Sequence, residues 1–136
     1  MELNQRSKNN LSGVHPVMVA IINKAVELFN DKYNQDSYFV ITEGVRTLER
    51  QKQLLADKKS QTLDSYHLTC HAVDVALFLN GKITWDIKDY KKFADIMKQA
   101  TKDLGYEIVW GGDWKKFKDA VHFQIDRNKY KWRLEK

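Results

Sequence analysis

The sequence is poorest in cysteine, with Cys70 as the only one among 136 residues. A single thiol cannot close an internal disulfide, which excludes a small fold built on an oxidised framework. No apolar run approaches the roughly 20 residues that a helix needs to cross a bilayer. The opening residues, MELNQRSKNN, lack the apolar centre of a signal peptide. We therefore expect a protein that is made in the cytoplasm without a signal peptide or a transmembrane segment.

Proline and glycine are also scarce, with one and six residues respectively. The chain has no linker rich in these residues, no internal repeat and no low-complexity tract. A chain of this length can bury one hydrophobic core. We therefore expect a single domain over residues 1–136, with a basic tail over about 127–136 that is either solvated or in contact with an acidic partner.

Neither sign of charge dominates the sequence. The 23 basic and 18 acidic residues give a formal net charge of +5. This surplus favours polyanionic partners such as nucleic acid, anionic lipid or an acidic cell-wall polymer, but a solvated lysine-rich surface explains it equally well. Because we find neither a basic stripe with stacking aromatics nor a nucleic-acid-binding signature, we expect no nucleic-acid partner.

The first half of the chain contains two helical patterns around one strand. Pro16 suits the first turn of a helix, and apolar residues follow it at helical spacing. The aromatic and β-branched residues 37–42 predict a strand. Thr47 is a suitable cap for a helix over about 47–58, with a polar loop after it to about residue 66. The apolar side of that helix is predicted to be Leu48, Leu54 and Leu55.

The second half predicts hairpins around a long helix. HAVDVALFL (71–79) reads as a strand, NGK as a tight turn and ITW as the returning strand. Asp86 is a suitable cap for a helix that continues to Leu104. Two more strands are expected over 106–110 and 120–125. This mixture favours an α+β fold, an antiparallel sheet with helices packed on it.

Strand alternation brings polar side chains together on one face of the sheet. Asp74 shares its face with two alanines, and His122 lies on the face opposite the apolar residues of the last strand. His67, in the preceding loop, can reach the same cleft. Two imidazoles and a carboxylate match the ligands of catalytic zinc, and Asp119 is a candidate general base. Any one of these residues taken alone is more often a hydrogen-bonded structural residue.

Three motifs in the same order resemble a known family. SYHLTCHAVD resembles the S-x-H-x-x-G-x-A-x-D signature of zinc peptidases that cut bacterial peptidoglycan. DAVHFQ resembles their D-x-x-H-[FV]-[EQ] element, and EGVRT their strand-end G-x-R-T. The family includes D-alanyl-D-alanine carboxypeptidases and phage L-alanyl-D-glutamate endopeptidases. The resemblance implies a single hedgehog/DD-peptidase-like domain.

The resemblance also implies roles for individual residues. The matching positions for the Zn2+ ligands are His67, Asp74 and His122. Asp119 matches the catalytic acid/base, and Arg46 the catalytic and substrate-binding arginine that contacts a substrate carboxylate or carbonyl and steadies the oxyanion. Ser65 matches the signature serine, a substrate contact or a support for the ligands.

Several residues near the motifs remain open to two interpretations. Cys70 stands where the family has glycine, and its thiol could pack harmlessly or reach the metal. In WGGDW, Trp110, Asp113 and Trp114 could line a substrate groove or cover the core edge. His71 is expected to be structural, because alternation turns it toward the apolar face.

The resemblance implies a zinc-dependent lytic peptidase, an endolysin of bacteriophage type, that cuts peptidoglycan stem peptides at L-Ala-D-Glu. Such a protein waits in the cytoplasm until the membrane is opened, acts on the cell wall and is expected to be a monomer. A D-Ala-D-Ala carboxypeptidase of the same mechanism, a non-catalytic cell-wall-binding module and a thiol hydrolase based on Cys70 are the alternatives. The binding module predicts an incomplete metal set, whereas His67, Asp74, His122 and Asp119 are all present.

Overall fold

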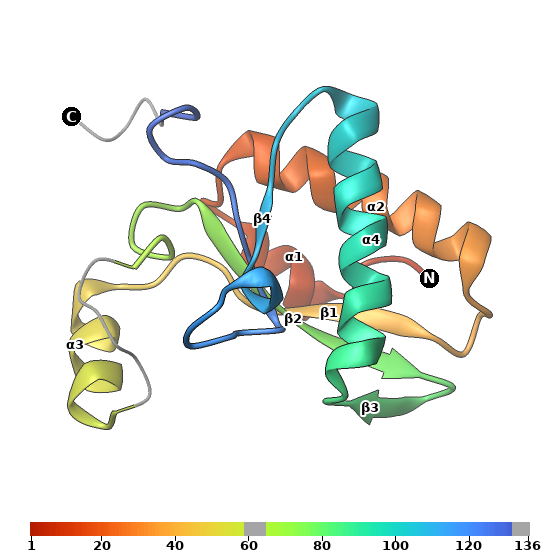
Figure 1. The fold of residues 1–136 in the computed structure, drawn as a ribbon, viewed down its shortest axis with the longest axis horizontal. Coiled ribbons are helices and arrows are strands. Elements are labelled where there is room, and N and C mark those ends of the chain that lie inside the picture. The colour runs from red at the N-terminus through yellow and green to blue at the C-terminus, as the bar shows by residue number, and fades with distance from the viewer. Residues whose placement is uncertain (59–64, 132–136) are drawn as a thin grey trace.

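A computed structural model describes residues 1–58 and 65–131 (Figure 1). The elements that it contains are α1 (Gln5–Leu11), α2 (Pro16–Lys32), β1 (Tyr38–Glu43), α3 (Leu48–Ala56), β2 (Ala72–Leu79), β3 (Lys82–Thr84), α4 (Ile87–Leu104), β4 (Val109–Trp110), the 3-10 helix η1 (Gly111–Asp113) and β5 (His122–Gln124). In this part of the chain, no helix is long and apolar enough to span a membrane.

The strands form one antiparallel sheet in the order β1-β2-β5-β4. β1 pairs with one edge of β2. The other edge of β2 pairs first with β5, through residues 72–74, and then with β3, through residues 77–79. The expected α+β fold with an antiparallel sheet is therefore confirmed, and β2 lies at its centre.

The hydrophobic core lies between this sheet and the crossed helices α2 and α4 (Figure 1). Val73, Val75 and Leu77 point into the core from β2, each no more than 1% exposed. Phe123 of β5 is fully buried beside them. Because side chains alternate along a strand, Asp74 and His122 project from the opposite face. The alternation expected from the sequence is confirmed.

Local sequence signals fix the ends of several elements. Asn80 and Gly81 both have positive φ, 52° and 79°, as a two-residue hairpin turn requires. The side chain of Asp86 accepts a hydrogen bond from the Lys88 amide and caps α4, and Gly105 ends that helix at φ 78°. These predicted boundaries are confirmed.

Helix α1 was not expected, because the opening residues are polar. It lies along the outer edge of β1 and meets that edge with polar side chains. Ser7 Oγ accepts a hydrogen bond from the Ile41 amide at 2.9 Å, and Asn10 Nδ2 donates to the Ile41 carbonyl at 2.8 Å. The helix therefore satisfies backbone groups that an edge strand would otherwise expose.

The predicted apolar side of the helix over 47–58 is wrong in part. Leu54 is buried, but Leu48 and Leu55 are 52% and 37% exposed, while Gln51 is fully buried. α3 buries a polar side chain because that side chain reaches Arg46 rather than the hydrophobic core.

Two predicted strands are shorter than expected. Of residues 106–110 only Val109–Trp110 form a strand, and of 120–125 only His122–Gln124. The tail is not wholly solvated, since Tyr130 packs on the core and its hydroxyl accepts a hydrogen bond from the Glu107 amide at 3.0 Å. Most of the predicted loop over 58–66, and the end of the tail over 132–136, lie outside the described residues.

Candidate metal centre and active site

Three side chains from distant parts of the chain converge at one end of β2. His67 follows the undescribed segment, Asp74 lies in β2, and His122 lies directly opposite Asp74 in β5. Asp74 Oδ1 is 3.2 Å from both His67 Nε2 and His122 Nδ1. Among the described residues these three form a group whose donor atoms all lie within 4.8 Å of one another.

Each imidazole is oriented by a second hydrogen bond. His67 Nδ1 donates to the Gly44 carbonyl at 2.8 Å, and His122 Nε2 donates to Gln124 Oε1 at 2.8 Å. Since an oxygen acceptor fixes the proton on the ring nitrogen that it contacts, the other nitrogen of each ring is turned toward Asp74. Such outer hydrogen bonds are the usual support of metal-binding histidines.

The trio fits a zinc ion in composition, and two of its three spacings match those of a tetrahedral site. Zinc takes imidazole nitrogen and carboxylate oxygen at about 2.0–2.2 Å in tetrahedral geometry, which places neighbouring ligand atoms about 3.3 Å apart. The two 3.2 Å separations at Asp74 Oδ1 match that edge. Three protein ligands would leave a fourth position open for water or substrate, as catalytic zinc sites require.

The charge of Asp74 is strongly stabilised. Burial opposes ionisation, but the hydrogen bonds and charges of His122 and His67, when each ring carries both protons, outweigh burial and hold the pKa of Asp74 well below its usual range. Burial also lowers the pKa of His122, yet the hydrogen bond and charge of Asp74 raise it overall. Asp74 therefore stays ionised, and its negative charge favours either a proton on the neighbouring imidazole or a bound cation.

Asp119 lies where the last loop enters β5, and its environment differs from that of Asp74. Its amide donates to the Gly111 carbonyl at 3.0 Å, and its carbonyl accepts from the His122 amide at 3.2 Å. Burial and the nearby charge of Asp74 raise the pKa of the Asp119 carboxyl. Two carboxyls whose pKa values move in opposite directions are suited to different roles, one as a ligand and one in proton transfer.

Arg46 approaches the same centre from the end of β1. Its amide donates to the His67 carbonyl at 3.1 Å, and its Nη2 is 4.0 Å from Asp74 Oδ2. Two parallel bonds to Glu43, of 2.7 and 2.8 Å, hold the guanidinium plane. Gln51 accepts a third bond at 2.6 Å, which explains why a polar residue is buried in α3. The positive charge of Arg46 is thus rigidly placed beside the trio.

The tight turn before β2 supports His67. Ser65 is buried, and its hydroxyl accepts bonds from the His67 amide at 3.2 Å and from Arg46 Nη1 at 3.4 Å. Cys70 closes the turn at φ 68°, the left-handed conformation that favours glycine. This explains why glycine would suit the position, and Cys70 is not a member of the trio found among the described residues.

The three residues singled out in WGGDW have different surroundings. Trp110 is 2% exposed, and its Nε1 donates to the Ala120 carbonyl at 2.7 Å. Asp113 is exposed and forms an ion pair with Lys98 at 2.6 Å. The Trp114 ring lies 5.3 Å from the ring of His122, so it is the member of the three that adjoins the trio.

His71 lies away from the trio, as expected. It is fully buried, and its ring nitrogens contact Thr69 Oγ1 and the Tyr130 carbonyl. Its ring also packs against that of His15 at 5.2 Å. His71 therefore joins the turn before β2 to the C-terminal segment.

The sequence did not reveal three residues that support the site. Glu43 and Gln51 hold Arg46, and Gln124 holds His122. Glu43 and Gln124 lie inside the motifs EGVRT and DAVHFQ and could have been singled out there. Gln51 carries no such signal, since its role depends on how α3 packs.

Comparisons with known proteins agree on one family. A family model described as phage L-alanyl-D-glutamate peptidase matches residues 1–131. The L-alanyl-D-glutamate peptidase of Escherichia phage T5 is 32% identical over 130 residues, which cover 93% of this chain and 90% of the phage protein. The peptidoglycan L-alanyl-D-glutamate endopeptidase CwlK of Bacillus subtilis (strain 168) is 32% identical over 136 residues, covering 86% and 76%.

A solved structure has the same architecture. The crystal structure of the Serratia marcescens L-Ala D-Glu endopeptidase ChiX superposes with a TM-score of 0.83 at 36% identity. The match covers 96% of this chain and 93% of the other.

Proposed function

The chain belongs to the phage L-alanyl-D-glutamate peptidase family, and we propose that it is a zinc-dependent endopeptidase that hydrolyses the L-Ala-D-Glu bond of peptidoglycan stem peptides. The observation that carries this proposal is the convergence of His67, Asp74 and His122 next to a second carboxyl of raised pKa, Asp119. The D-Ala-D-Ala carboxypeptidase alternative is not favoured, because the relatives are named for the L-Ala-D-Glu bond.

His67, Asp74 and His122 would hold the zinc ion. When bound, zinc supplies a Lewis acid that polarises a carbonyl and lowers the pKa of water. Asp119 accepts the proton of the attacking water and passes it to the leaving amine. Its raised pKa suits this exchange, since a group that both takes and gives a proton works best when its pKa lies near the working pH.

Arg46 supplies a fixed positive charge for the substrate. Because Glu43 and Gln51 fix the guanidinium before substrate arrives, little reorganisation is needed when negative charge develops on the scissile carbonyl. The glutamate of the cleaved bond also carries a carboxylate that this charge can attract. The Ser65 hydroxyl positions Arg46 and His67 by accepting a hydrogen bond from each. The Trp114 ring packs beside His122 and forms one side of the site. Trp110 and Asp113 remain proposed substrate contacts.

The proposed setting is the bacterial cell wall. The activity fits a lytic enzyme of endolysin type that reaches peptidoglycan after release from the cell in which it is made. We propose that it acts as a monomer, since the trio and Asp119 come from one chain.

The test is hydrolysis of purified sacculi by zinc-loaded protein. We expect new amino groups, and mass spectrometry should find peptides that begin with glutamate. His122→Ala should abolish release, and EDTA should do so reversibly. Loss of single alanine residues would instead identify a carboxypeptidase, and wild-type activity in His122→Ala would contradict the zinc mechanism.

A further inference from the structure

A second concave site lies outside the metal centre. It is an open groove of about 540 Å³ between the start of α4 and the segment that follows β4. Ile87, Trp110 and Gly112 supply its apolar part, and Lys88, Lys91, Lys92 and Lys118 its charged rim. None of these residues belongs to the trio. We call this site the lysine groove.

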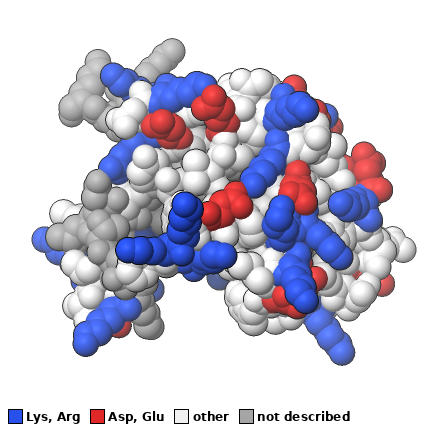
Figure 2. Space-filling view, viewed as in Figure 1, with Lys and Arg blue, Asp and Glu red and all other residues white. Residues whose placement is uncertain are grey.

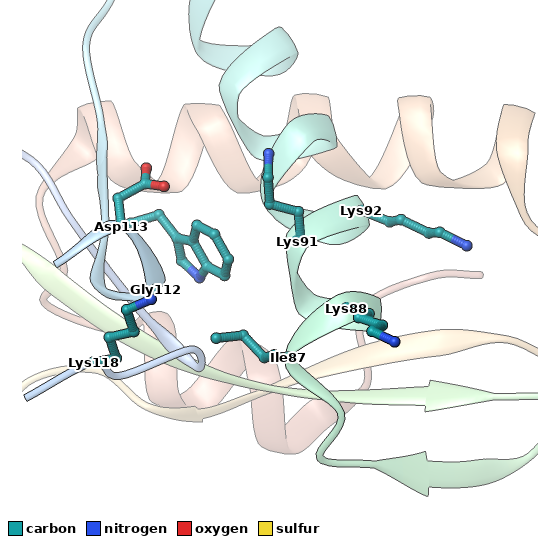
Figure 3. Close-up of a pocket in the computed structure, with 8 residues that line it drawn as sticks. Ile87, Lys88, Lys91, Lys92, Gly112, Asp113 and Lys118 are labelled. Atoms are coloured by element: carbon teal, nitrogen blue, oxygen red, sulfur yellow. The ribbon is translucent and has the colours of Figure 1, made fainter. Parts of the chain in front are cut away.

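The rim of the lysine groove is cationic. Figure 3 shows Ile87 pointing from α4 toward the loop that carries Lys118, while Lys88 and Lys92 extend from the opposite side of α4. The acidic residue in the lining, Asp113, is paired with Lys98 at 2.6 Å, and one rim lysine, Lys91, is paired with Asp95 at 3.3 Å. Figure 2 shows many basic side chains over α4 and the neighbouring loop on the same face, with acidic side chains between them. The groove therefore suits an anionic ligand with small apolar groups.

One segment connects the lysine groove to the metal centre. It lines the groove with Gly112, Asp113 and Lys118, and it carries Trp114 and Asp119 to the trio. The segment is held closely, because a Cβ on Gly111 would overlap the backbone of Asp119. The metal centre and the lysine groove therefore border the same segment of the chain.

We propose that the lysine groove binds a second stem peptide of the same peptidoglycan polymer, next to the one that is cleaved. This inference rests on the proposed function. The ligand chemistry follows from the cleaved bond itself: the glutamate carboxylate matches the lysine rim, and the alanine methyl matches the floor of Ile87 and Trp110. Neighbouring stem peptides repeat both groups along the polymer.

The test compares two triple variants of equal charge. K88Q/K91Q/K92Q removes the α4 side of the rim, and K8Q/K32Q/K102Q removes three exposed lysines from the last turns of α1, α2 and α4. Each lowers the net charge from +5 to +2. Glutamine keeps good helix propensity, and circular dichroism checks the fold.

Binding is measured by co-sedimentation of zinc-loaded protein with sacculi stripped of phosphate polymers, in an Asp119→Asn background that prevents digestion. We expect the groove triple to bind about tenfold more weakly and the control triple to bind like the parent. Amidating the carboxylates of the sacculi should weaken the parent to the same extent. With Asp119 restored, both triple variants should cleave a muropeptide that has one stem peptide, at a rate within about twofold of the wild-type rate.

Three outcomes would overturn the proposal: equal binding by the two triples, unchanged binding to amidated sacculi, or a groove-dependent loss of binding only to anionic phospholipid vesicles or DNA. Failure of the proposed function is seen separately. In that case the wild-type protein would cleave neither sacculi nor the muropeptide with one stem peptide, whatever the binding assay showed.

Discussion

At the scale of single residues, the two carboxyls of the site lie in environments that shift their pKa values in opposite directions. Asp74 receives hydrogen bonds from two imidazoles, while Asp119 is partly buried near the negative charge of Asp74. The same fold therefore favours the ionised form of one carboxyl and the protonated form of the other. This difference leads to a prediction that separates catalysis from stability.

We predict that Asp119→Asn lowers hydrolysis about 10²–10⁴-fold yet raises the thermal midpoint of the metal-free protein at pH 7. The raised pKa means that the folded state binds the Asp119 proton more tightly than the unfolded state. The resulting stability is fully present below about pH 3.9 and is lost as pH rises through the folded pKa. Asparagine cannot lose a proton, so its advantage should shrink as pH falls. Calorimetry at several pH values tests this, and an advantage that grew on acidification would contradict it.

At the scale of elements, the turn before β2 contains a strained residue. Cys70 adopts φ 68°, which costs an L-residue about 1–2 kcal/mol relative to right-handed backbone. The turn also positions His67, whose carbonyl accepts from the amide of Arg46. The chain therefore tolerates strain next to a proposed zinc ligand.

We predict that Cys70→Gly stabilises the protein by about 1 kcal/mol and retains hydrolysis, because glycine adopts positive φ without the Cβ clash. Cys70→Ala is the matched control, since it removes the thiol but keeps the Cβ. Chemical denaturation measures both. Equal stabilisation by the two variants would show that the thiol, and not the backbone angle, is the source of the cost, and loss of activity in Cys70→Gly would show that the thiol is needed.

Elements also show what can be predicted from the sequence. Alternation placed Asp74 and His122 on one face because a period of two is a property of the strand backbone itself. Leu48 and Leu55 were assigned to a buried face wrongly, because α3 is anchored through Gln51 to Arg46. α1 was missed for a similar reason, since Ser7 and Asn10 contact a strand edge rather than a core. Polar anchoring depends on tertiary neighbours, and no periodicity signals it.

At the scale of the whole molecule, the trio joins parts of the chain that are far apart in sequence. His67 precedes β2, Asp74 lies within it and His122 lies in β5. A metal that binds all three binds the folded state alone, so it stabilises that state by mass action.

We predict that zinc at about 100 times its Kd adds about 2.7 kcal/mol to the free energy of unfolding. Differential scanning fluorimetry with and without EDTA measures the corresponding shift in Tm. His122→Gln should lose the shift, while Asp113→Asn, which alters an exposed carboxylate outside the trio, should keep it. A shift of equal size in His122→Gln would show that zinc binds elsewhere.

The position of β5 between β2 and β4 determines when the centre can assemble during synthesis. Among the strands of the described residues, β5 is the last to be synthesised, and β2 and β4 each form hydrogen bonds with it. A nascent chain that ends before residue 122 has two of the three proposed ligands and lacks the strand that joins them. The three proposed ligands therefore cannot meet until residue 122 has been translated.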